Sequence, residues 1–177
     1  MSDSSLSSQD SYAEMVSRLA ERFKAQVQEF RGETTLQIQP EQILEICRLL
    51  SESEEFKTLV DETAVDYWPE ETPRFHLVYQ IRSIERNQII ALRVPLDGNE
   101  PVVSSVTSVY PNADYYEREL WDLFGIRFAG HPDLRRILMP HDWVGHPLRK
   151  DYPLGYEEPQ YSFNYDQVQA RKLNPKE

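Results

Sequence analysis

The sequence predicts an α+β fold, with helices packed on one face of a mostly antiparallel sheet and an extended proline-rich C-terminal arm. Three segments show helical spacing of apolar residues and four show the composition or alternation of strands. Prolines at 132, 140, 147 and 153 interrupt helices and remove donors from sheet ladders, which predicts the arm. We expect a flexible N-terminus over 1–10, one domain over 11–125, and the arm with its tail over 126–177.

The first helix is expected to begin at Ser11, which forms a capping box with Glu14, and to run through Gly32. Its apolar face is more consistent with core packing than with a partner surface. The residues at helical spacing are Tyr12, Val16, Leu19, Ala20, Phe23, Val27 and Phe30.

A short strand over Glu33–Gln39 follows, and Pro40 then opens a second helix that ends near the acidic run beginning at Glu52. Cys47 is interpreted as a small core residue, because a reactive thiol needs a basic neighbourhood. The inner face of this helix is predicted to carry Ile43, Leu44, Cys47 and Leu50.

Three further strands are expected, centred on Leu59–Val65, Phe75–Arg82 and Ile89–Leu96. The second alternates most clearly, whereas the third is almost continuously apolar and is expected to be buried on both faces. Residues 69–73 form a surface loop, and 102–110 are expected to make one helical turn.

The last helix is predicted between Pro111, which suits a first turn, and Gly125, which suits the position after the end. At 100° per residue its apolar residues gather on one side and three polar residues lie opposite. The apolar set is Ala113, Tyr116, Leu120, Leu123 and Phe124, and the polar set is Arg118, Glu119 and Asp122.

Glu117 is unexpected on that helix, because it projects among the apolar side chains. A carboxylate there must be paired, hydrogen-bonded or neutralised, since an unpaired buried charge is costly. Arg135, Arg136 and Arg149 are the available cationic partners. The alternative is a helix edge with Glu117 bent out to water.

The arm is apolar for a segment without regular structure, which indicates that it lies on another surface. Residues 131–153 carry four basic and three acidic side chains, a net charge of +1, whereas the whole chain carries −11. This acidity argues against nucleic-acid binding. Arginine and tryptophan together are typical of protein interfaces. The apolar residues of the arm are Ile137, Leu138, Met139, Trp143, Val144 and Leu148.

Composition excludes other classes of protein. The single cysteine rules out an internal disulfide framework and a cluster held by four thiolates of this chain. There is no run of eighteen apolar residues, and the N-terminus lacks the basic and apolar regions of a signal peptide. We therefore expect a cytoplasm-like compartment and membrane contact only through partners.

The C-terminal third contains a series of motifs at characteristic spacing. They are Glu117-Arg118-Glu119, Asp122-Leu123-Phe124, His131, Arg135, Ile137-Leu138, Trp143, Gly145 and Pro147-Leu148-Arg149-Lys150-Asp151-Tyr152. These motifs resemble the 30 kDa subunit family of respiratory complex I and its photosynthetic relatives, and the resemblance spans roughly residues 34 to 154. Two stretches, Thr35–Glu41 and Arg136–Pro140, are similar to the cyanobacterial and chloroplast branch of that family, subunit J of the NAD(P)H-quinone oxidoreductase.

The resemblance implies a non-catalytic structural subunit in the hydrophilic arm of the complex, packed against the large quinone-site subunit. It implies no cofactor in this chain, with iron–sulfur clusters and quinone on partner subunits. The complex would carry electrons from ferredoxin or a reduced nicotinamide to plastoquinone, coupled to proton translocation. The expected location is peripheral, on the cytoplasmic (stromal) side of the thylakoid membrane.

We predict that the arm carries an ion-pair network and two apolar anchors that fix it to the domain or to a partner. Packing internal to the fold is the alternative for all of them. The network residues are Glu117, Arg135, Arg136 and Arg149, the anchors are Trp143 and Leu148, and Lys150 and Asp151 complete the motif.

The alternative function is a stand-alone metal-dependent hydrolase that uses His131, His141 and His146. Zinc accepts three protein ligands and a water molecule, and these histidines share one region. Their spacing matches no compact metal motif, which disfavours this hypothesis. The sequence also lacks a glycine-rich phosphate loop and a Gly-x-Ser-x-Gly elbow.

Overall fold

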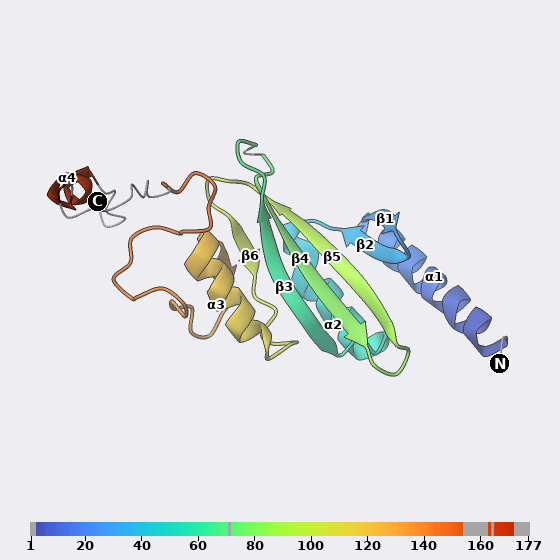
Figure 1. The fold of residues 1–177 in the computed structure, drawn as a ribbon. Helices are drawn as coiled ribbons and strands as arrows, with labels where there is room; N and C mark the ends of the chain where they lie inside the picture. Colours follow the sequence, from blue (N-terminus) through green and yellow to red (C-terminus); the bar gives the residue numbers. More distant parts are fainter. Residues whose placement is uncertain (1–2, 71, 154–162, 164, 172–177) are drawn as a thin grey trace.

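The computed structural model describes residues 3–70, 72–153, 163 and 165–171. Five strands form one sheet in the order β1-β2-β5-β4-β3, and only the β2–β5 pair is parallel (Figure 1). This confirms the predicted α+β class with a mostly antiparallel sheet. The strands are β1 (Gln26–Phe30), β2 (Glu33–Gln37), β3 (Thr58–Asp66), β4 (Phe75–Ser83) and β5 (Gln88–Leu96).

In Figure 1, α2 lies behind the sheet and α3 lies beside the edge strand β3. Two short strands, β6 (Val102–Ser104) and β7 (Arg127–Ala129), pair in parallel as a second sheet. No helix in the described part of the chain is long and apolar enough to cross a membrane. The helices are α1 (Asp3–Phe23), α2 (Ile43–Ser53) after a 3-10 turn at Pro40–Gln42, α3 (Ala113–Phe124) and α4 (Tyr165–Arg171).

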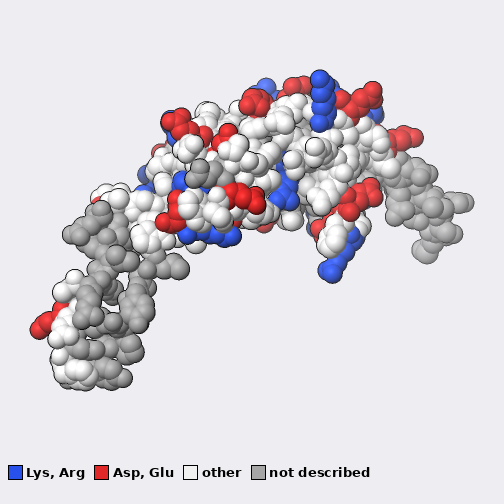
Figure 2. All heavy atoms as spheres, turned by 90° about the horizontal axis from the view of Figure 1, so that it is seen from above, with Lys and Arg blue, Asp and Glu red and all other residues white. Residues whose placement is uncertain are grey.

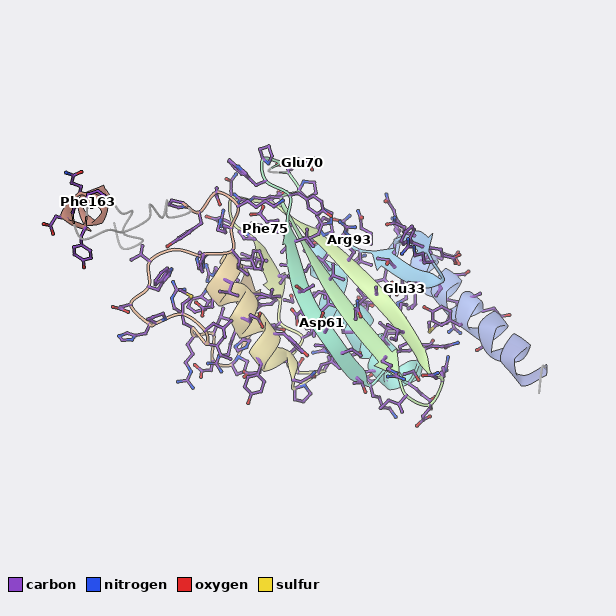
Figure 3. All side chains as sticks on the ribbon, in the orientation of Figure 1. Glu33, Asp61, Glu70, Phe75, Arg93 and Phe163 are labelled. Atoms are coloured by element: carbon purple, nitrogen blue, oxygen red, sulfur yellow. The ribbon has the colours of Figure 1, made fainter. Side chains whose placement is uncertain are left out.

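The core lies between the helices and one face of the sheet. Alternate residues of β4 are buried, as the strand pattern predicts, and side chains stand on both sides of the sheet in Figure 3. On α2, Ile46 is buried where Leu44 was expected. The buried apolar residues of the three main core elements are Met15, Val16, Leu19 and Phe23 of α1, Ile43, Ile46, Cys47 and Leu50 of α2, and Phe75, Leu77, Tyr79 and Ile81 of β4.

The N-terminal helix differs from the expectation at both ends. It begins at Asp3, so the stretch expected to be flexible over 1–10 is helical from that residue, and it ends at Phe23. Lys24 has a positive φ of 51°, which breaks the helix, and residues 26–30 then form β1. Val27 and Phe30, assigned to the helix face, are exposed on this edge strand because it pairs with β2.

Two other expectations differ from the structure. Strand β5 is fully buried on one face only, and Ile89 on the other face is exposed. The helical turn expected over 102–110 is present only at 106–110, where the Tyr110 amide donates to the Val106 carbonyl at 2.9 Å. Residues 102–104 form strand β6, because two adjacent valines suit a pleated strand and β7 supplies the partner.

The C-terminal arm begins later than residue 126. Ile126 and Phe128 are core residues and β7 pairs with β6, so we use "C-terminal arm" for residues 130–153. All of these residues are described and none lies in a helix or strand. The tail that follows carries four aromatic residues, and the sequence predicts that they also lie along a partner. Tyr156 and Tyr161 lie outside the described residues, whereas Phe163 and Tyr165 are exposed.

Candidate protein interface

The C-terminal arm closes the carboxyl end of α3. The last four carbonyls of a helix have no partner within it, and here each accepts a hydrogen bond from the chain that follows. Gly125 begins this cap with a positive φ of 77°. The Trp121 carbonyl accepts from the Gly125 amide (3.0 Å), and the Asp122 carbonyl accepts from Arg136 Nη1 (3.2 Å) and His146 Nδ1 (3.0 Å). The Leu123 carbonyl accepts from the Leu148 amide (3.0 Å), and the Phe124 carbonyl accepts from Arg149 Nη1 (3.5 Å).

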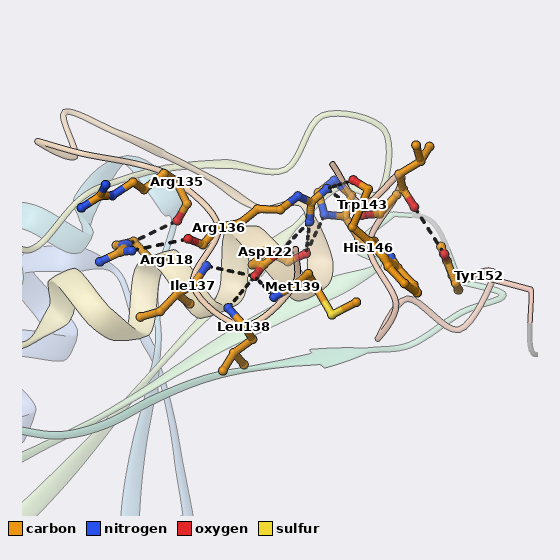
Figure 4. Close-up of polar contacts among 12 residues, drawn as sticks. Arg118, Asp122, Arg135, Arg136, Ile137, Leu138, Met139, Trp143, His146 and Tyr152 are labelled. Carbon is orange, nitrogen blue, oxygen red and sulfur yellow. Dashed lines mark hydrogen bonds and ion pairs between the residues drawn. The ribbon is translucent and has the colours of Figure 1, made fainter. Parts of the chain in front are cut away.

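The Asp122 carboxylate is the first attachment point of the arm, and it is 0% exposed. Its Oδ2 accepts hydrogen bonds from three successive amides, those of Ile137 (3.1 Å), Leu138 (2.9 Å) and Met139 (2.8 Å), while Oδ1 pairs with Arg136 (Figure 4). Burial alone would raise the pKa of this carboxyl, but the amides and the guanidinium hold the pKa below its usual value.

Arg136 connects this point to the next part of the arm. Its Nη2 donates to the carbonyls of Trp143 (2.8 Å) and Gly145 (3.0 Å) (Figure 4). Its guanidinium also lies over the Trp121 ring, 5.7 Å from the ring centre. One side chain therefore links α3 to two positions of the arm. A planar fork of five donors suits this arrangement better than a lysine would.

The second attachment point is the buried Arg74, which lies just before β4. It makes a bidentate pair with Asp66 (2.9 Å twice) and another with Asp151 of the arm (2.6 and 3.0 Å). The Lys150 amide also donates to Asp66 Oδ2 at 2.8 Å. The hydrogen bonds from Arg74, aided by Arg149, lower the pKa of Asp151 to about 2.

The two arginines of this second point share an aromatic neighbour. The guanidinium of Arg74 lies 4.9 Å from the centre of the Phe75 ring, and that of Arg149 lies 5.2 Å from it. Phe75, labelled in Figure 3, stands at the beginning of β4. The C-terminal arm is thus fixed to both α3 and the sheet.

Held in this way, the arm turns aliphatic side chains outward. Leu138 is 61% exposed and Val144 is 53% exposed, and Leu148 and Ile137 are also exposed. Figure 2 shows the molecule from above, and acidic and basic side chains are interspersed on that face. Exposed aliphatic residues on a rigidly held segment are typical of a protein-binding surface.

The three arginines of the predicted network are ion-paired, but none of them pairs with Glu117. Glu117 is 0% exposed, and its Oε1 accepts a hydrogen bond from the Val106 amide at 2.6 Å. Neither the pairing with arginine nor the alternative of a side chain bent out to water was therefore correct. Arg135 pairs with Asp133 at the surface. Arg149 lies 3.3 Å from Asp151, and Arg136 pairs with Asp122.

The sequence interpretation missed the two carboxylates that hold the arm. Asp122 was placed on the polar face of the helix, although it is buried, and Asp66 and Arg74 were not singled out. Trp143 is half-buried and its Nε1 has no hydrogen-bond partner in the described part of the chain. Leu148 is exposed and Lys150 contributes its backbone amide, so their roles as interface residues stay predictions.

The three histidines of the hydrolase alternative do not form a metal site. Among the described residues no group of three potential ligands gathers around one point. His131 accepts from the Asp133 amide (3.0 Å), His146 binds the Asp122 carbonyl, and His141 is exposed. Two of these rings thus bind backbone groups of the arm and α3, and this arrangement does not support the hydrolase.

Comparison with known proteins identifies the family. The family described as "Respiratory-chain NADH dehydrogenase, 30 Kd subunit" matches residues 36–158. The C subunit of NADH-quinone oxidoreductase from Roseiflexus sp. (strain RS-1) is 47% identical over 151 residues, which are 84% of this chain and 86% of that protein. The corresponding protein of Geobacter sulfurreducens is 46% identical over 142 residues, covering 78% of this chain and 88% of the relative.

Solved structures agree with the fold. The trypsin-resistant fragment of Nqo5 superposes with a TM-score of 0.62 at 29% identity, covering 69% of this chain and 98% of the fragment. A chain of the membrane-bound sulfane sulfur reductase, an archaeal respiratory membrane complex, gives a TM-score of 0.64 at 24% identity, over 81% of this chain and 86% of that one, and supports the fold alone. This chain belongs to the 30 kDa subunit family of respiratory-chain NADH dehydrogenase, as its C-terminal motifs predicted.

Proposed function

We propose that this chain is a structural subunit, without an active site of its own, in the hydrophilic arm of a complex I-like oxidoreductase. Its relatives in bacterial NADH-quinone oxidoreductases support membership of that complex, peripheral to the membrane. The resemblance of Thr35–Glu41 and Arg136–Pro140 to the cyanobacterial and chloroplast branch supports a photosynthetic complex. In that case the complex delivers electrons from ferredoxin or a reduced nicotinamide to plastoquinone at the thylakoid membrane.

The observation that carries the proposal is the C-terminal arm. It has no helix or strand, it is fixed through two buried carboxylates, Asp122 and Asp66, and it exposes aliphatic side chains. A segment held rigidly with apolar residues outward is prepared to bind a larger protein. We propose that this protein is the large quinone-site subunit of the complex, and that iron–sulfur clusters and quinone belong to partner subunits.

The test is co-purification of the large quinone-site subunit with a tagged chain from solubilised membranes. Leu138→Asp and Val144→Asp each place a charge on the exposed surface of the arm, and each is expected to reduce recovery of that partner at least tenfold, because burying an unpaired charge costs several kcal/mol. Ile84→Asp is the matched control, since Ile84 is 72% exposed in the turn between β4 and β5. Equal recovery with all three variants would remove the arm from the interface.

Two further substitutions test the predicted anchors. Trp143→Ala should lower the abundance of the complex, because truncating a large aromatic residue at an interface commonly costs about 2 kcal/mol or more. Arg149→Glu should reduce co-purification, because it reverses a charge beside Asp151 and the end of α3. Unchanged complex abundance in both variants would show that these residues serve the fold alone.

A further inference from the structure

Two carboxyl side chains are buried at the centre of the domain without a cationic partner. Glu62 on β3 is 3% exposed and Glu117 on α3 is 0% exposed. Both oxygens of Glu62, Oε2 of Glu117 and the hydroxyl of Tyr79 lack a hydrogen-bond partner among the residues the structure describes. Tyr79 lies opposite Glu62 in the β3–β4 ladder. Buried polar groups are normally satisfied, so such a concentration of unsatisfied oxygens requires a cause.

The side chains around this pair are neutral or acidic. Tyr79 of β4 and Cys47 of α2 lie near Glu62, and Asp114 and Ser105 lie near Glu117, whereas Asp61 precedes Glu62 on β3 and its side chain points to the other face of the sheet. No described lysine or arginine makes an ion pair with either glutamate. Two negative charges cannot remain together in such surroundings, because the single amide bound to Glu117 Oε1 offsets only part of the desolvation and no cation offsets the repulsion. At least one of the carboxyl groups must therefore carry a proton.

One imidazole lies beside Glu117. The side chain of His131, at the beginning of the C-terminal arm, is fully buried, and its Nε2 lies 4.0 Å from Glu117 Oε2 and 3.4 Å from Asp114 Oδ1. Since Nδ1 of His131 accepts from the Asp133 amide, Nε2 carries hydrogen, and it donates to the Asp114 backbone carbonyl at 3.3 Å. The separation of 4.0 Å is too long for a hydrogen bond, so Glu117 Oε2 gains no donor from this ring.

We propose that Glu62 and Glu117 form a buried proton-binding site, with Tyr79 as an additional donor. The ligand is a proton, held as the O–H of a carboxylic acid between β3 and α3. Release of that proton leaves a carboxylate on α3, and the proton passes to solvent. The site is independent of the proposed role of the arm as a docking surface.

The pKa values agree with this arrangement. Burial, together with repulsion by Glu117, raises the pKa of Glu62 well above its ordinary value, and burial raises the pKa of Glu117 to about 7. The folded protein therefore binds protons that the unfolded chain has already released at weakly acidic pH. A raised folded pKa stabilises the fold at low pH, and this stabilisation is lost as pH rises through about 7 for Glu117.

The experiment measures the urea unfolding equilibrium of the full chain between about pH 5 and about pH 8, a window that begins above the ordinary glutamate pKa of about 4.3 and includes the pKa of about 7 for Glu117. As the pH rises from the ordinary glutamate pKa to the folded pKa of each group, that group should raise the unfolding equilibrium constant of the wild-type protein by up to roughly tenfold per pH unit. Glu62→Gln and Glu117→Gln should each remove part of this rise. Glu119→Gln, on the exposed face of the same helix, is the control and should retain it.

Infrared spectra of wild-type protein with isotope-labelled glutamate provide a second measurement that needs no variant to fold. A carbonyl band of a protonated carboxylic acid should persist at neutral pH and shift in deuterated water. Absence of that band, or a pH dependence of unfolding that is the same in both glutamine variants and in wild type, would overturn the proposal.

Discussion

Asp122→Ala tests whether the C-terminal arm depends on one buried carboxylate. The substitution removes the acceptor of three backbone amides and the partner of Arg136. Removing one partner of a buried ion pair costs about 3–5 kcal/mol. Each buried amide left without an acceptor costs about 1–3 kcal/mol in principle. These costs do not add fully, because the arm can detach into water, so we expect a total loss of about 3–5 kcal/mol.

A domain of this kind is typically stable by about 5–15 kcal/mol, so the variant should still fold. Urea unfolding gives the loss of stability, and limited proteolysis shows whether residues 130–153 become accessible. Asp122→Asn should lose less, because its amide oxygen still accepts hydrogen bonds, and the exposed Glu119→Ala is the control. A loss below about 1 kcal/mol, with the arm still protected, would refute the reasoning, because that is the value of an ordinary exposed ion pair.

Two further predictions concern the ends of the same attachment. Gly125→Ala is expected to cost about 2–4 kcal/mol in thermal or urea unfolding, because its φ is positive and a Cβ would lie 2.6 Å from the His146 ring. Gly130→Ala, with a positive φ but no atom within 4 Å, should cost only about 1–2 kcal/mol, and equal losses would exclude a role for the close approach. Asp151 has a lowered pKa, so its stabilisation is present above the unfolded value of about 4 and is lost as pH falls toward about 2. Asp151→Asn should remove about 1–2 kcal/mol of that acid dependence, allowing for its partial exposure, and an unchanged acid slope would contradict the role of Arg74.

The fold could be predicted where one local pattern had no competitor. Helix α3 has apolar residues at helical spacing and a glycine after its end, and β4 alternates without interruption. The first hairpin could not be predicted, because Val27 and Phe30 also continue the helical spacing of the preceding segment. Pairing of β1 with β2 decides the outcome there, and a tertiary contact of that kind overrides local propensity.

The attachment of the arm could be predicted only in part. The arginines were recognised because basic residues in an apolar segment require acidic partners, and Arg136 and Arg149 do have them. The partners were missed because Asp122 looks like a surface residue on its helix until the arm covers it. An arginine was predicted as the partner of Glu117, whereas its actual donor is the Val106 amide. That donor could not be predicted, because a backbone group leaves no mark in the pattern of side chains.

The closure of α3 by the C-terminal arm has a consequence for the thermodynamics of association with a partner. Because the amides of residues 137–139 are already bound to Asp122, a partner meets an ordered segment and need not fold it. Binding should then resemble the docking of two rigid bodies, with a modest heat-capacity change and no large ordering entropy. The protein would be ready for assembly as soon as its own core had formed.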